Sequence, residues 1–132
     1  MTLESPTIKI STSAEEIFNY LTDLGNFEGL MPENITKFKL MGKNKFIFAL
    51  AGMPEIMLEK KIQYANEKII LGAADGKLDF SIEINISSVE IRECEAKILF
   101  EGKFNPMMSM MIKRPISKFI ETLATNIEKS VQ

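Results

Sequence analysis

Apolar and polar residues alternate with a period of two between residues 35 and 104, and this pattern constrains the fold more than any other feature. The clearest case is the segment KLDFSIEINIS (77–87), in which Phe80, Ile82 and Ile84 share one phase while polar residues occupy the other. Because successive side chains of a strand point to opposite faces, such a segment predicts a strand with one buried face. The region therefore predicts an antiparallel sheet that is covered on one side only.

Turn signals divide this region into about six strands. GKN at 42–44 and Asp75-Gly76 are typical of tight connections between strands. A further short alternating segment, PTIKIS (6–11), predicts one more strand near the start of the sequence. We expect six to seven strands, the longer ones within the segments ITKFKLM (35–41), KFIFALA (45–51), EIMLEKKIQY (55–64), KIILGAA (68–74), KLDFSIEINIS (77–87) and CEAKILFEGKF (94–104).

A short helix is predicted directly after the first of these strands. Ser13 and Glu16 have the Ser-x-x-Glu spacing of a capping box, and apolar residues follow at helical spacing. Gly25 is a typical C-terminal cap for this helix. The next stretch, NFEGLMPEN (26–34), predicts one more helical turn or an irregular corner. Together these segments predict a short helix pair.

A long amphipathic helix is predicted at the C-terminal end. Apolar residues recur at helical spacing after Pro115, and proline is well tolerated at a first helical position, so we expect this helix to begin near Pro115. The preceding stretch NPMMSMMIKRP (105–115) then predicts a flexible entry turn that could act as a gate. Its four methionines cannot all face inward, since successive helical residues are about 100° apart. Core packing, a cavity mouth and a contact surface all remain open for them.

Length, charge and cysteine content narrow the classes of protein. The 132 residues fit one domain (1–132) whose core can contain a cavity. Sixteen basic and eighteen acidic residues give a net charge of -2, which does not favour nucleic acid as a partner. No apolar run approaches the ~20 residues of a membrane span, and the lone Cys94 cannot form an internal disulfide. We expect a cytoplasmic protein without integral membrane association.

The sequence contains no histidine, which removes several kinds of chemistry. A Ser-His or Cys-His nucleophile, a histidine general base and a His-ligated zinc ion are excluded. Carboxylates such as Asp23 and Glu28, lysine, tyrosine and Cys94 remain as reactive groups, although helix-end solubility also explains the two carboxylates. We expect no cofactor and no metal, and the sequence favours binding over catalysis.

Two segments resemble the START-like superfamily, also called the helix-grip or SRPBCC fold. They are SAEEIFNYLTDLGNFEGLMPENI (13–35) and NPMMSMMIKRPISKFIETLATNIEKS (105–130), and the order of elements is similar along the whole chain. The resemblance is to the polyketide cyclase/dehydrase and lipid-transport-like proteins of that superfamily. It implies an α+β helix-grip fold, in which a curved antiparallel sheet wraps around a long C-terminal helix. It also implies a cavity between sheet and helix for sterols, lipids, polyketides, quinones or other apolar molecules. Leu30-Met31-Pro32 stands where such proteins often have a tryptophan.

The candidate cavity residues share an apolar side chain on the predicted inner face, with one exception, Lys60. Each of them could equally be plain core, because burial alone explains apolar periodicity. The candidates are Phe18, Phe27, Met31, Phe38, Phe46, Phe48, Ile56, Leu58, Lys60, Phe80, Ile82, Ile98, Phe100, Met107, Met108, Met111, Ile112, Ile116, Phe119, Ile120 and Leu123.

Lys60 shares the strand phase of Leu58 and Ile62, which would aim its ammonium group at the apolar side. An unpaired buried charge is costly, so Lys60 must be paired, reach out to water at a strand end or be displaced by a β-bulge. Alternatively, it is a polar contact for a ligand carboxylate or carbonyl. Tyr20 and Tyr64 are further candidates for orienting a ligand.

Three functions remain open from the sequence. The first is binding or transport of a small hydrophobic or amphipathic molecule (lipid-, polyketide- or quinone-like), exchanged by movement of the corner at 26–34 against the segment 105–115. The second is an enzyme of the cyclase, dehydrase or hydrolase type that uses carboxylate or lysine chemistry. The third is a scaffold with a filled core whose exposed methionines contact a partner protein.

Overall fold

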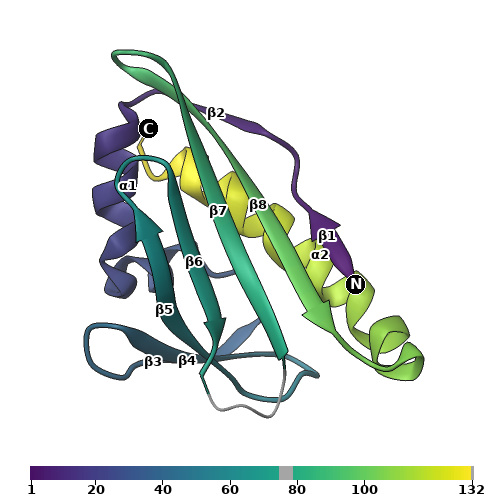
Figure 1. Cartoon of the computed structure of the whole chain (residues 1–132). Coiled ribbons are helices and arrows are strands. Elements are labelled where there is room, and N and C mark those ends of the chain that lie inside the picture. Colours follow the sequence, from purple (N-terminus) through teal and green to yellow (C-terminus); the bar gives the residue numbers. More distant parts are fainter. Residues whose placement is uncertain (75–78, 132) are drawn as a thin grey trace.

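The computed structural model describes residues 1–74 and 79–131, which fold into a curved antiparallel sheet packed on a long helix (Figure 1). The elements in chain order are β1 (Thr2–Glu4), β2 (Ile8–Ile10), α1 (Ala14–Thr22), the 3-10 helix η1 (Leu24–Leu30), β3 (Ile35–Leu40), β4 (Lys45–Leu50), β5 (Ile56–Tyr64), β6 (Lys68–Ala73), β7 (Asp79–Glu90), β8 (Glu93–Lys103) and α2 (Pro106–Lys129). The predicted Asp75-Gly76 turn lies outside the described residues.

The sheet is formed by strands that pair with their neighbours in sequence from β3 to β8. Its order is β1-β8-β7-β6-β5-β4-β3, with β2 also paired to β8, and every pairing is antiparallel. β1 and β3 form its two ends, so the sheet is not closed into a barrel. β3 and β4 cross the direction of β7 and β8, and α2 runs along the concave side (Figure 1). The predicted helix-grip architecture is confirmed.

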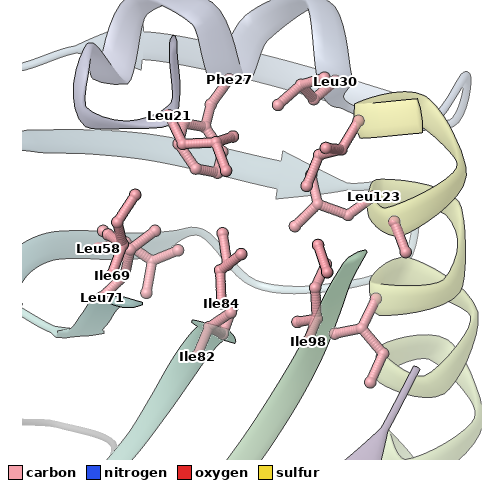
Figure 2. Packing of buried hydrophobic residues seen from close by; sticks show 14 of the residues in the cluster. Leu21, Phe27, Leu30, Leu58, Ile69, Leu71, Ile82, Ile84, Ile98 and Leu123 are labelled. Carbon is pink, nitrogen blue, oxygen red and sulfur yellow. The ribbon is translucent and has the colours of Figure 1, made fainter. Parts of the chain in front are cut away.

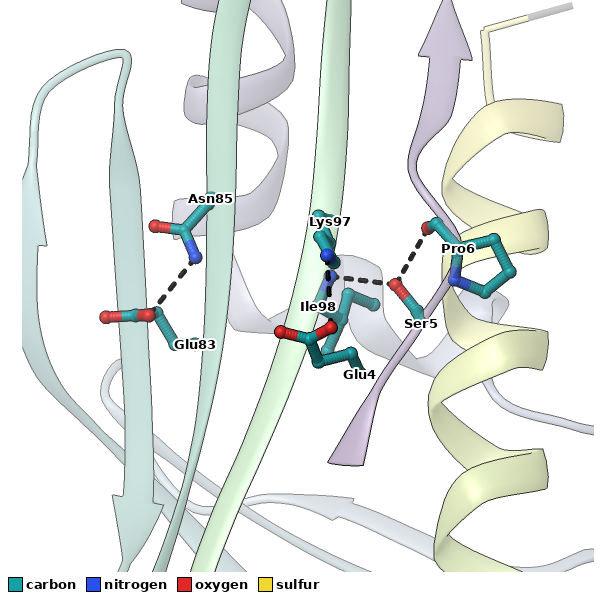
Figure 3. Close-up of polar contacts among 7 residues, drawn as sticks. All are labelled: Glu4, Ser5, Pro6, Glu83, Asn85, Lys97 and Ile98. Carbon is teal, nitrogen blue, oxygen red and sulfur yellow. Dashed lines mark hydrogen bonds and ion pairs between the residues drawn. The ribbon is translucent and has the colours of Figure 1, made fainter. Parts of the chain in front are cut away.

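Ser5 joins the two short N-terminal strands to β8. Its backbone N–H donates to the Ile98 carbonyl at 2.8 Å, and its Oγ accepts from the Ile98 N–H at 2.8 Å (Figure 3). The same hydroxyl donates to the Pro6 carbonyl at 3.0 Å. This buried side chain therefore accepts a hydrogen bond from a backbone N–H of β8, at the gap between β1 and β2 where neither strand pairs with it. The sequence did not predict β1, because Leu3 is its one apolar residue and a single apolar position shows no alternation.

The first helix begins as predicted and ends earlier than predicted. Ser13 Oγ accepts from the Glu16 N–H at 3.1 Å, whereas the Glu16 carboxylate accepts from Thr12 Oγ1 and not from the Ser13 backbone. α1 ends at Thr22 because Asp23 is extended and caps η1 instead, its Oδ1 accepting from the Gly25 N–H at 3.2 Å. Gly25 is thus part of η1 and not a C-terminal cap, so that prediction is wrong. The predicted short helix pair is present.

The C-terminal helix is longer than the sequence predicted, and it begins at Pro106. The expected start near Pro115 and the expected entry turn at 105–115 are therefore wrong. Asn105 caps the helix through its Oδ1, which accepts from the Met108 N–H at 2.8 Å, and Pro106 occupies the first turn. Pro115 lies inside the helix and leaves the Met111 carbonyl without its usual N–H donor. The helix nevertheless continues through this position to Lys129.

The buried side chains form one cluster between the sheet, the two short helices and the C-terminal half of α2. In Figure 2, side chains from the sheet, η1 and α2 face a common interior, among them Leu58, Leu30 and Leu123. Asn126 Nδ2 also donates to the Leu30 carbonyl at 2.8 Å, which ties α2 to the end of η1. We call this part of the molecule the closed end.

Candidate functional site

A cavity of about 410 Å³ lies between the sheet and the part of α2 from Met108 to Thr122, next to the core cluster. Its volume is within the range of small-molecule sites in proteins, roughly 300–1,000 Å³. Its walls come from the end of β4 and the following connection, from β5, β7 and β8, and from α2. The lining residues are Pro32, Asn34, Leu50, Ala51, Gly52, Met53, Pro54, Ile56, Phe80, Phe100, Phe104, Met108, Met111, Ile112, Pro115, Lys118, Phe119 and Thr122.

Three phenylalanines form a continuous aromatic wall on the sheet side of the cavity. The ring centroids of Phe80 and Phe100 are 5.6 Å apart, and those of Phe100 and Phe104 are 6.2 Å apart with an interplanar angle of 3°. Gly102 allows this arrangement, because a Cβ there would approach the Phe104 ring to 2.3 Å. On the helix side, Phe119 stacks on Phe48 of the core at 5.2 Å. The wall is therefore aromatic and apolar.

Methionines form the mouth of the cavity. Met108 and Met111 line it although they are 37% and 70% exposed, so their side chains meet both the cavity and solvent. Met107 and Met110 are 75% and 82% exposed and do not line it. The prediction that the four methionines cannot all face inward is confirmed. Two flexible, polarizable side chains thus lie between the cavity and solvent.

Few polar side chains reach the cavity. Asn34, Lys118 and Thr122 do so, and Lys118 is the only charged lining residue within residues 1–74 and 79–131. A second, more polar groove begins at these three residues and continues along the outer side of α2. The cavity is therefore apolar in its interior and polar along one edge.

Solved structures with similar folds cover nearly the whole chain. XoxI from Bacillus cereus aligns with a TM-score of 0.77 at 9% identity, covering 98% of this chain and 94% of that one. A START superfamily protein from Mycobacterium smegmatis aligns with a TM-score of 0.71 at 14% identity, covering 98% and 96%. The chain has the START-like fold. No protein-family model matches its sequence, and no curated protein matches it either.

A third START-like neighbour carries bound molecules. Norcoclaurine synthase from Thalictrum flavum, in complex with dopamine and hydroxybenzaldehyde, aligns with a TM-score of 0.75 at 13% identity, covering 99% of this chain and 86% of that one. At such identities the likeness shows the fold alone.

Seven of the candidate residues predicted from the sequence line this cavity: Ile56, Phe80, Phe100, Met108, Met111, Ile112 and Phe119. Met31 borders the polar groove instead, and Met107 points to solvent. The remaining apolar candidates pack in or against the core cluster outside the cavity lining: Phe18, Phe27, Phe38, Phe46, Phe48, Leu58, Ile82, Ile98, Ile116, Ile120 and Leu123.

Lys60 lies away from the cavity and stabilises a helix end. A register shift between Lys60 and Ile62 marks the β-bulge that was one expected alternative. The Lys60 ammonium donates to the Thr22 carbonyl at 2.8 Å, at the C-terminal end of α1, where a positive charge is favourable. Tyr20 and Tyr64 are also absent from the cavity lining. The alternative of Lys60 as a ligand contact in this cavity has no geometric support.

Several lining residues were missed from the sequence. The connection from Leu50 to Pro54 appears in the sequence only as a break in the strand pattern. Phe104 has the same strand phase as Phe100, but it was not among the predicted cavity residues. Because the helix was expected to start at Pro115, Lys118 and Thr122 were predicted to lie on its solvent-exposed face. Extending that helix back to the Asn105 cap would have placed Met111, Lys118 and Thr122 on one stripe.

No three His, Cys, Asp or Glu side chains within residues 1–74 and 79–131 are arranged to hold a metal ion. None of the helices in that part of the chain is both long and apolar enough to cross a membrane. Cys94 is buried on β8, and burial raises the pKa of its thiol, which disfavours the reactive thiolate.

Proposed function

We propose that this protein binds a small apolar or amphipathic molecule, of lipid-, polyketide- or quinone-like character, in the cavity between the sheet and α2. The observation that carries the proposal is an apolar cavity of about 410 Å³ next to the buried core cluster. Transfer of apolar surface from water into such a site is favourable by about 25 cal/mol per Å². Binding, and not conversion, is the function that this lining supports best.

The composition of the lining supports binding over catalysis. No aspartate or glutamate lines the cavity among residues 1–74 and 79–131, so general acid–base chemistry with carboxylates lacks a group within reach. Lys118 stays available for lysine chemistry, and the synthase among the neighbours keeps the enzyme alternative in view. The scaffold alternative expects a filled core, which the cavity does not fit.

The entry route proposed here passes the methionine mouth. The corner at 26–34 is held in place, since Leu24, Phe27 and Leu30 are buried and the Leu30 carbonyl accepts from Asn126. Met108 and Met111, in contrast, are flexible side chains in contact with solvent. Rotamer changes of these two methionines would open the cavity without moving the backbone.

A cytoplasmic location is consistent with the cysteine content of this chain, because its one cysteine is a buried free thiol.

The test is a titration with the neutral apolar dye N-phenyl-1-naphthylamine, followed by the increase in its fluorescence. The wild-type protein is expected to bind the dye with saturation at one site. Met108→Trp, which places a large ring at the mouth, is expected to weaken binding at least about tenfold, or 1.4 kcal/mol. Met107→Trp is the matched control, because Met107 lies on the same helix and does not line the cavity.

Equal effects of the two tryptophan variants would contradict the site. A wild-type protein that binds neither this dye nor 1-decanol would contradict the proposed function itself. Native mass spectrometry of the purified protein adds an independent readout, since a retained ligand appears as a defined mass increment.

A further inference from the structure

The apolar cavity and the polar groove share one edge, and this edge determines which ligands fit. Pro32, Asn34, Lys118 and Thr122 line both spaces. A molecule with its apolar body in the cavity would therefore place its other end beside the Lys118 ammonium and the polar groups of Asn34 and Thr122. The protein offers an apolar chamber with a polar exit on this side.

The charged groups of the groove favour a negative head group. Its lining contains the cations Arg114, Lys118 and Lys129 against the anions Glu33 and Glu121. None of these three cations forms an ion pair with any carboxylate of the described residues. The local excess of positive charge contrasts with the net charge of -2 for the whole chain. An anion at this edge gains attraction that a neutral or positive group does not.

The position of Lys118 suits this role. Its residue lines the apolar cavity while remaining exposed, as a long side chain does when its methylene stem lies on apolar surface and its ammonium group stays in water. An anionic group beside it would also remain partly hydrated, so the cost of desolvating the charge is small. Asn34 and Thr122 supply hydrogen-bond donors on the same edge.

We infer that the ligand class is an amphipath with a single anionic head group, a carboxylate, sulfate or phosphate, whose apolar body fills the cavity and whose head pairs with Lys118. This inference rests on the proposed function, because it specifies the ligand of the same cavity. It adds a direction to binding: the apolar end lies against Phe80 and Phe100, and the head points along α2 into the groove.

The experiment compares two probes of equal chain length, decanoate and 1-decanol, by isothermal titration calorimetry at neutral pH. Lys118→Gln is expected to weaken decanoate binding about threefold to tenfold more than it weakens 1-decanol binding. Lys118→Arg is expected to retain decanoate binding. Lys113→Gln is the matched control, since Lys113 is an exposed cation of the same helix that lines neither space.

The outcomes separate this inference from the proposed function. If 1-decanol binds but Lys118→Gln weakens decanoate binding no more than 1-decanol binding, the anionic head-group site is wrong and the binding function stands. If the Lys118 and Lys113 variants weaken decanoate binding equally, the effect comes from the overall charge of the protein, and this result would also overturn the inference. If the wild-type protein binds neither probe, the binding function fails and this inference fails with it.

Discussion

The two halves of the space between sheet and helix differ in how completely side chains fill it. At the closed end, α1, η1 and the C-terminal half of α2 all contribute buried residues, and Phe27 stacks on Phe46 with centroids 5.5 Å apart. At the other end, α2 faces β7 and β8 across a cavity of about 410 Å³. We call the latter the open end. One helix over a curved sheet leaves space, whereas three helical segments together pack closely against it.

The largest difference is expected from removing one phenylalanine at each end. Phe27→Ala at the closed end should lower the free energy of unfolding by about 3–5 kcal/mol, because a close-packed site cannot collapse around the missing ring. Phe104→Ala at the open end should cost less than half of that, because Phe104 is only half-buried and already borders empty space. Urea denaturation measures both losses. Equal losses would show that the two ends are packed alike.

Replacing Ser5 tests the attachment of β1 and β2 to β8, which stabilises both ends of the molecule. Ser5→Ala leaves the Ile98 N–H without an acceptor and should cost about 1–3 kcal/mol of unfolding free energy. Ser87→Ala on the exposed part of β7 is the control, and it should change stability by less than about 0.5 kcal/mol. If both serine variants unfold at the same urea concentration, the Ser5 contact contributes nothing measurable.

Replacing Lys60 tests whether a charged side chain at the closed end takes part in ligand binding. Lys60→Met removes the contact with the Thr22 carbonyl and should cost about 1 kcal/mol of stability, with the affinity for 1-decanol unchanged. Lys39→Met, on the exposed side of β3, serves as the control for a lysine lost from the surface. Weaker 1-decanol binding by Lys60→Met at unchanged stability would move the site toward α1.

The sheet and the buried faces were predictable from the sequence because period-two alternation directly encodes them. Phe80, Ile82 and Ile84 fall in one phase, and all three are buried on one side of β7. The sequence prediction failed where two local signals indicated different starts for the same helix. Pro115 indicated a helix start, and the Asn105-Pro106 cap, with its hydrogen bond from the Met108 N–H, gave the true one.

The division between core and cavity was not predictable in the same way. Ile98 and Phe100 have the same strand phase and nearly equal burial, yet only Phe100 lines the cavity. Periodicity reports which face of a strand is covered, and the distance to the covering helix depends on sheet curvature. The Leu50–Pro54 connection joined the site for the same reason, since only the folded topology places it opposite α2.

The most direct test of the open end uses the methionine methyl groups as probes. In protein labelled with ¹³C at these methyls, the nine methionines report from different places, and Met53, Met108 and Met111 line the cavity while Met41 and Met57 do not. Titration with 1-decanol is predicted to shift the NMR signals of Met53, Met108 and Met111 with one common dissociation constant. Unchanged signals from these three, or equal shifts at Met41 and Met57, would contradict a ligand site at the open end.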